Sequence, residues 1–123
     1  MDKKRILIVE DDADLRKTLQ DFLIAENFDA IVAMDGENGI NLAKSEKPDL
    51  LLLDIILPKK DGYEVLQELK SNQETKNIPV ILLTNLESAA DVEKALKLGA
   101  TTYLTKADYK LEEVAEKIRE TLK

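Results

Sequence analysis

The chain has 123 residues, of which 44% are hydrophobic and 35% charged, a composition typical of one globular domain that buries its own core. Its formal net charge of −7 disfavours direct binding to nucleic acid or to an anionic membrane, because both need a cationic surface. The chain has no cysteine and no histidine, which excludes disulfides, thiolate zinc sites and a histidine general base. Any phosphohistidine chemistry would have to come from another protein.

The amino terminus, MDKKRILIVEDD, begins basic, but its apolar run is too short for the core of a signal peptide and ends in acids. No other stretch approaches the length needed to cross a bilayer. We therefore expect a cytoplasmic protein, with one domain over residues 1–123.

Apolar runs of strand length recur along the chain, and several are apolar at every position, as in strands that are covered on both faces. They predict strands at Arg5–Val9, Asp29–Ala33, Asp49–Leu53, Ile78–Thr84 and Thr101–Thr105.

Segments with helical spacing lie between these runs. One stripe joins Leu15, Leu19, Phe22 and Leu23, a weaker one Val65, Leu66 and Leu69, and a third Leu111, Val114, Ala115, Ile118 and Leu122. A capping box beginning at Ser88 precedes the stripe Val92, Ala95 and Leu96, and Gly99 stands where that helix would stop. The order is strand then helix, five times, which predicts a mainly parallel sheet with helices on both faces.

Polar side chains follow the predicted strands where each one ends. Glu10, Asp11 and Asp12 follow the first strand, Asp54 ends the third, Thr84 ends the fourth and Lys106 follows the fifth. The carboxyl ends of parallel strands form the usual functional crevice of such a sheet. Carboxylates converging there repel one another by about 4 kcal/mol per pair at an effective dielectric near 20. A hard divalent cation with oxygen ligands fits best, and Mg²⁺ needs no histidine or cysteine.

Each of these residues also has an ordinary structural explanation. Asp11 or Asp12 could cap the following helix, Asp54 could turn to solvent at the strand end, and Thr84 and Lys106 could be a strand residue and a surface charge. Their joint placement at consecutive strand ends favours a common site.

The sequence resembles the receiver domain of two-component response regulators, the CheY-like family. The resemblance rests on ILIVEDD, LLLLDIILPKKDG, VILLT and YLTK in that order, with intervals of 30 residues from Asp54 to Thr84 and of 52 from Asp54 to Lys106. It implies a flavodoxin-like α/β fold, doubly wound, with five parallel strands in the order 2-1-3-4-5.

The resemblance also implies a role for each site residue. Asp54 would be the phosphoacceptor, and Thr84 and Lys106 would contact the phosphoryl oxygens. Magnesium would be held by Asp11, by Asp12 more through water, by Asp54 and by the Ile56 carbonyl. Pro58, Asp61 and Gly62 match as structural support, with Asp61 placed to cap the third helix.

The implied function is a phosphorylation-dependent switch rather than an enzyme, although it takes part in magnesium-dependent phosphoryl transfer and slow self-dephosphorylation. The donor would be a sensor histidine kinase or a phosphotransfer protein. Thr84 and Tyr103 would move on phosphorylation and alter the surface of the fourth helix, fifth strand and fifth helix. We expect the output to be binding to another protein, by a monomer or weak dimer.

The sequence departs from the family pattern near the site. Ala107 follows Lys106 where the family usually has a proline after a cis bond, so we expect a trans Lys106–Ala107 bond and a shifted loop. Asn85 replaces a smaller residue and could narrow access to the site. Ile56 and Leu86 are apolar at two rim positions, where we expect them to exclude water and lengthen the phosphorylated lifetime.

Other functions fit the residues less well. A flavodoxin-like ligand binder would need a phosphate-cradling loop after the first strand, where this chain has Glu-Asp-Asp. A phosphohydrolase with an aspartate nucleophile would need an acid at position 56, which is isoleucine. A degenerate receiver serving only as a phosphorylation-independent interaction module remains open because of Asn85 and Ala107.

Overall fold

The computed structural model describes residues 3–54, 61–84, 89–105 and 110–123. Strands and helices alternate in the predicted order. The strands are β1 (Arg5–Val9), β2 (Asp29–Ala33), β3 (Leu50–Leu53), β4 (Val80–Thr84) and β5 (Thr102–Thr105). The helices are α1 (Ala13–Ala25), α2 (Gly36–Glu46), α3 (Gly62–Ser71), α4 (Ala89–Lys97) and α5 (Leu111–Thr121).

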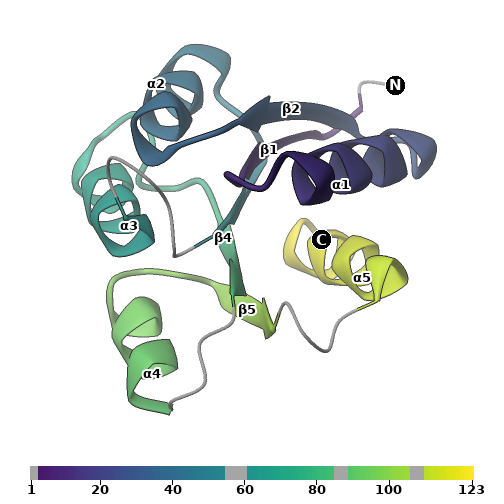
Figure 1. The fold of residues 1–123 in the computed structure, drawn as a ribbon. Coiled ribbons are helices and arrows are strands. Elements are labelled where there is room, and N and C mark those ends of the chain that lie inside the picture. The colour runs from purple at the N-terminus through teal and green to yellow at the C-terminus, as the bar shows by residue number, and fades with distance from the viewer. Residues whose placement is uncertain (1–2, 55–60, 85–88, 106–109) are drawn as a thin grey trace.

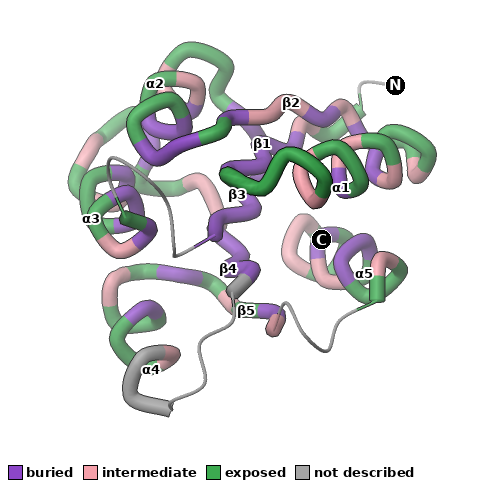
Figure 2. Tube along the Cα trace, in the orientation of Figure 1, coloured by how far each residue is buried: buried purple, intermediate pink, exposed green. Residues whose placement is uncertain are grey.

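The five strands form one parallel sheet in the order β2-β1-β3-β4-β5, which confirms the predicted topology. Helices α1 and α5 lie on one side of the sheet and α2, α3 and α4 on the other (Figure 1). The central strands are buried along their length (Figure 2), as their continuous apolar sequences predict.

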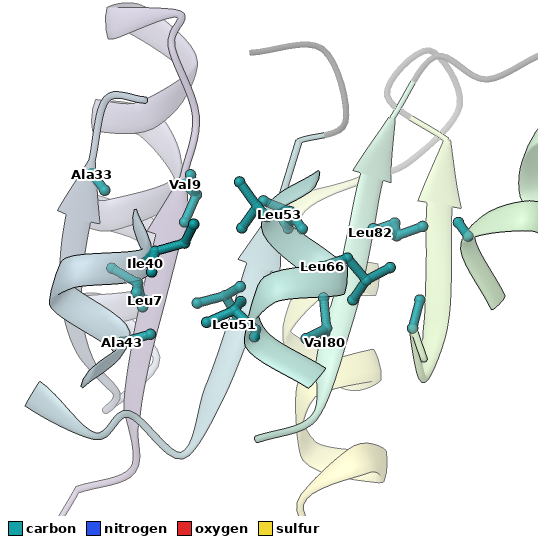
Figure 3. Packing of buried hydrophobic residues seen from close by; sticks show 14 residues of the cluster. Leu7, Val9, Ala33, Ile40, Ala43, Leu51, Leu53, Leu66, Val80 and Leu82 are labelled. Carbon is teal, nitrogen blue, oxygen red and sulfur yellow. The ribbon is translucent and has the colours of Figure 1, made fainter. Parts of the chain in front are cut away.

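Alternate residues of β1, β2, β3 and β4 point into two separate hydrophobic layers. Leu7 and Val9 of β1 pack beneath α2 and α3, whereas Ile6 and Ile8 pack beneath α1 and α5. Figure 3 shows the first layer, with Leu51 and Leu53 of β3 among its labelled side chains. The central strands β1 and β3 must therefore be apolar on both faces. The polar residues that follow them begin where the strands end.

The predicted helical stripes are largely confirmed. Leu19 and Leu23 of α1, the α3 stripe and the middle of the α5 stripe are buried. Asp61 caps α3 as predicted, its Oδ1 accepting from the Glu64 amide at 3.0 Å. Leu96 is a correction: it is 40% exposed, because the buried contact of α4 is made by Ala95. The capping box at Ser88 lies outside the described residues.

Three strands begin one or two residues later than predicted. Pro79 has no amide to give to a sheet, and the Ile78 amide donates instead to the Thr75 carbonyl at 3.0 Å. Gly99 ends α4 as predicted, with φ of 112°. The methylene groups of Lys70 lie against Gly99, while its Nζ donates to the Lys76 and Ile78 carbonyls. Burial lowers the pKa of Lys70.

Candidate metal and phosphoryl site

The register of the two central strands brings two acids side by side. Val9 of β1 is level with Leu53 of β3, so the next residues along these strands are Glu10 and Asp54. The Asp54 amide donates to the Val9 carbonyl at 3.0 Å, which carries the pairing one step past the end of β3. The two carboxylates thus start from adjacent backbone positions at the carboxyl edge of the sheet.

Glu10 also makes hydrogen bonds to β2 through its backbone and to Asp12 through its side chain. Its amide donates to the Ala33 carbonyl of β2 at 3.1 Å, and its Oε2 accepts from the Asp12 amide at 3.2 Å. Both Glu10 and Asp54 are buried, with 1% and 4% of their surface exposed. Two carboxylates with so little contact with water need compensating partners to remain charged.

Asp11 completes an acidic group at this edge. Carboxylate oxygens of Glu10, Asp11 and Asp54 all lie within 4.8 Å of one another, and Asp11 is exposed. This donor set consists of oxygen alone and is open to solvent on one side, as Mg²⁺ prefers, because it retains several waters. The group therefore fits a magnesium ion.

Asp12 has a different position from the other acids. Its backbone is extended and its Oδ1 accepts from the amides of Asp14 and Leu15, at 3.0 and 3.1 Å. It is the N-cap of α1, the structural alternative that the sequence left open. Asp12 lies outside the group of three, and its contact with magnesium through water stays a prediction.

Comparison with known proteins places the chain in a family. The model of the response regulator receiver domain matches residues 6–119. The chain belongs to the response regulator receiver family. Its predicted family membership and fold are confirmed.

Named relatives agree with this assignment. The receiver is 43% identical over 120 residues to the transcriptional regulatory protein CiaR of Streptococcus pneumoniae, covering 97% of this chain and 51% of CiaR. It is 41% identical over 103 residues to the alkaline phosphatase synthesis transcriptional regulatory protein PhoP of Bacillus subtilis, covering 84% of this chain and 42% of PhoP. The receiver thus spans about half the length of these relatives.

A solved structure gives the same result. The BeF₃-activated N-terminal receiver domain of Klebsiella pneumoniae RstA superposes with a TM-score of 0.89 at 31% identity, covering 98% of this chain and 99% of that one. None of the helices in the described part of the receiver is long and apolar enough to span a membrane.

The remaining predicted residues of the receiver are placed in part. Thr84 ends β4, level with Thr105 at the end of β5, so its backbone reaches the same edge of the sheet as Asp54. Tyr103 lies in β5 and is 40% exposed. Ile56, Pro58, Asn85, Leu86, Lys106 and Ala107 lie outside the described residues, and so does the predicted trans Lys106–Ala107 bond.

Two residues that contribute to this edge of the receiver were not predicted from the sequence. Glu10 was recognised as an acid but was not assigned to the metal group, although the interval of 44 residues between strand partners β1 and β3 also separates Glu10 from Asp54. Arg16 was not considered, and its Nη1 donates to the Glu10 carbonyl at 2.9 Å. The local sequence signal at Arg16 is a positive charge near the start of a helix, where the helix dipole disfavours it, but that signal does not identify the group that Arg16 contacts.

Proposed function

We propose that this receiver is a phosphorylation-dependent switch in which Asp54 accepts a phosphoryl group. The observation that carries the proposal is the buried Asp54 carboxylate at the end of the central strand β3, within 4.8 Å of Glu10 and Asp11. A buried acid beside two other carboxylates costs free energy unless a cation offsets the repulsion. Acids in such surroundings are concentrated at functional sites.

The proposed chemistry requires positioning more than covalent help from the protein. An Asp54 carboxylate oxygen forms the new bond to phosphorus, and the bond from phosphorus to the donor's histidine nitrogen breaks, with its electron pair returning to that nitrogen. Strand β3 and the Val9 carbonyl fix Asp54 for this attack. When bound, Mg²⁺ would neutralise charge on the phosphoryl oxygens.

Each residue has a proposed role in this arrangement. Asp11 and Asp54 would hold magnesium together with the Ile56 carbonyl, with Glu10 beside them and Asp12 acting through water. Thr84 and Lys106 would contact the phosphoryl oxygens. Phosphorylation adds negative charge and strong acceptor oxygens, and we propose that Thr84 and Tyr103 respond by moving toward the site.

The biological setting follows from this role. The phosphoryl donor would be a sensor histidine kinase or a phosphotransfer protein, and the output would be contact with another protein by a monomer or weak dimer in the cytoplasm. The receiver would not be an enzyme in its own right, but it would take part in phosphoryl transfer and slow self-dephosphorylation.

The test is incubation with Mg²⁺ and acetyl phosphate, followed by measurement of intact mass. We expect wild type to gain one phosphoryl group, Asp54→Asn to gain none, and removal of Mg²⁺ by a chelator to prevent the gain. Asp21→Asn makes the same chemical change on the exposed face of α1 and should be phosphorylated as wild type is.

Two results would contradict the proposal. A phosphoryl group that Asp54→Asn gains as readily as wild type would place the acceptor elsewhere. A wild type that gains none, and that also binds no beryllofluoride in the presence of Mg²⁺, would leave the degenerate receiver that acts only as an interaction module.

A further inference from the structure

The guanidinium group of Arg16 ties α1 to the main chain of the acidic segment. Its Nη1 donates to the Glu10 carbonyl at 2.9 Å and lies 3.4 Å from the Asp11 carbonyl. The contact spans five to six residues and is made to backbone atoms, so Arg16 contacts the segment that carries the acids without occupying a carboxylate oxygen in these two bonds.

The carbonyls of Glu10 and Asp11 lie beyond the end of strand β1. β1 ends at Val9, and just beyond it the Glu10 amide donates to the Ala33 carbonyl and the Asp54 amide donates to the Val9 carbonyl. A buried carbonyl beyond a strand end needs a donor from another element. Arg16 supplies it, so the Glu10 peptide is held by β2 through its amide and by α1 through its carbonyl.

Arg16 breaks a local rule of helix composition. It follows Ala13, Asp14 and Leu15 at the start of α1, where the helix dipole disfavours a positive charge. Departures of this kind, when a specific contact compensates them, are concentrated at functional sites. Here the compensation is the bond to the segment that bears Glu10 and Asp11.

We propose that Arg16 is a positioning residue of the metal and phosphoryl site, fixing the main chain from which Glu10 and Asp11 project. This inference rests on the proposed function, because it concerns the same site. Arg16 acts through the backbone and makes no contact with the metal or the phosphoryl group in this role.

The direction in which Mg²⁺ affinity changes when Arg16 is removed distinguishes this positioning role from a purely electrostatic one. If Arg16 acted only as a nearby positive charge, removing it would tighten Mg²⁺ binding, because like charges repel. If Arg16 acts by holding the carbonyls, removing it frees the acidic segment, and Mg²⁺ binding weakens.

The test compares Mg²⁺ affinity in three variants, by titrating backbone amide NMR shifts in the absence of any phosphodonor. Arg16→Met removes charge and donor, and we expect Mg²⁺ to bind about tenfold more weakly, the usual loss when a group supporting metal ligands is removed. Arg16→Lys keeps the charge but lacks the guanidinium geometry, and we expect a loss of about threefold.

Lys17→Met is the matched control. Lys17 is the next residue of α1, carries the same charge, and pairs with Asp21 on the exposed face, its side chain 76% exposed. We expect Lys17→Met to bind Mg²⁺ within about twofold of wild type, since an exposed pair contributes little. Thermal unfolding without Mg²⁺ checks that each variant is folded at the titration temperature.

The inference is overturned if Arg16→Met binds Mg²⁺ as tightly as wild type or more tightly, or if Lys17→Met loses as much as Arg16→Met. Should Arg16→Met fail to fold, Arg16→Lys decides: a loss beyond about twofold supports the inference and an unchanged affinity refutes it. In each of these refuting cases wild type still binds Mg²⁺, so the proposed function stands. A wild type that binds no Mg²⁺ refutes both.

Discussion

Asp12 lies next to the acidic group, but its side chain caps helix α1. It ends the acidic run and begins α1, with its Oδ1 accepting two amides of the first turn. These amides have no partner within the helix, so a cap at this position stabilises the fold. The cap also fixes where α1 starts, and hence where Arg16 lies.

Replacing Asp12 separates capping from metal binding. We expect Asp12→Ala to lower the free energy of unfolding by about 1 kcal/mol and Asp12→Ser to keep it within about 0.5 kcal/mol of wild type, because serine also caps helices. Urea denaturation without Mg²⁺ measures both.

The same variants carry a second comparison. Because Asp12 lies outside the group of three acids, Asp12→Ser should weaken Mg²⁺ binding less than Asp11→Asn does. Equal losses in the two variants would make Asp12 a metal ligand and would contradict this assignment.

At this scale the sequence located the acids, but the metal ligands predicted from it included Asp12 and left out Glu10. Three acids in a row offer the same chemistry, and which of them faces Asp54 depends on the strand register and on the residue at which α1 begins. Glu10 is in the group because the pairing of β1 with β3 continues past Val9. Asp12 is excluded because α1 begins immediately after it.

Helix α2 approaches β1 closely at Gly39, next to the site. A Cβ atom built on Gly39 would lie 2.9 Å from Cγ2 and 3.0 Å from Cγ1 of Val9. Figure 3 shows Val9 in the layer beneath α2, close to Ile40. The Val9 carbonyl accepts from the Asp54 amide, so a shift of Val9 would displace the hydrogen-bond partner of the proposed phosphoacceptor.

Gly39→Ala should therefore destabilise the fold, although alanine is the better helix former by about 1 kcal/mol. We expect a net loss of about 1 kcal/mol, because overpacking a stiff, buried valine outweighs helix propensity. Urea denaturation measures the change in the free energy of unfolding.

A double-mutant cycle with Val9→Ala provides the control. With the valine methyl groups gone, Gly39→Ala should stabilise by about 1 kcal/mol through helix propensity alone, so the two changes should couple favourably by about 2 kcal/mol. Additive effects in the cycle would show that the glycine is needed for some other reason.

Elements were predicted well where periodicity is strong and less well where it is weak. The continuous apolar runs of β1 and β2 predicted both strands at their observed bounds. In α4 the predicted stripe included both Ala95 and Leu96, and Leu96 was wrong, because so short a helix has too few apolar positions to define one face. The late start of β4 follows from Pro79 and the Thr75 turn.

For the whole molecule, bringing the carboxylates of Glu10, Asp11 and Asp54 together costs free energy, which a bound cation would offset. Unfolding separates Glu10 and Asp54, which lie 44 positions apart in the chain, and so relieves their repulsion. An ion that binds the folded state alone raises the free energy of unfolding by about 2.7 kcal/mol at one hundred times its dissociation constant.

We accordingly expect Mg²⁺ at a hundredfold excess over its dissociation constant to raise the free energy of unfolding by about 2–3 kcal/mol, measured by urea denaturation. NaCl at matched ionic strength should give a smaller rise, and Asp11→Asn should lose most of the magnesium effect. An equal rise with NaCl would mean that general screening, rather than a bound ion, is responsible.

The architecture as a whole was predictable because strand and helix alternate so regularly that few topologies remain. The exact strand order came from the resemblance to the receiver family, since alternation alone does not say which strand lies in the centre. The described structure then explains why β1 and β3 are central: both are buried at nearly every position.

The division of the core into two layers has a consequence for biosynthesis. The layer under α2, α3 and α4 takes its helices from the middle of the chain described here, whereas the layer over α1 also needs α5, which is synthesised after all the other described elements. A nascent chain can thus finish one side of its sheet while Ile6, Leu52 and Ile81 on the other still await Val114 and Ile118. During that interval the nascent chain exposes the hydrophobic sheet face that α5 will cover, and this face is a binding surface for chaperones.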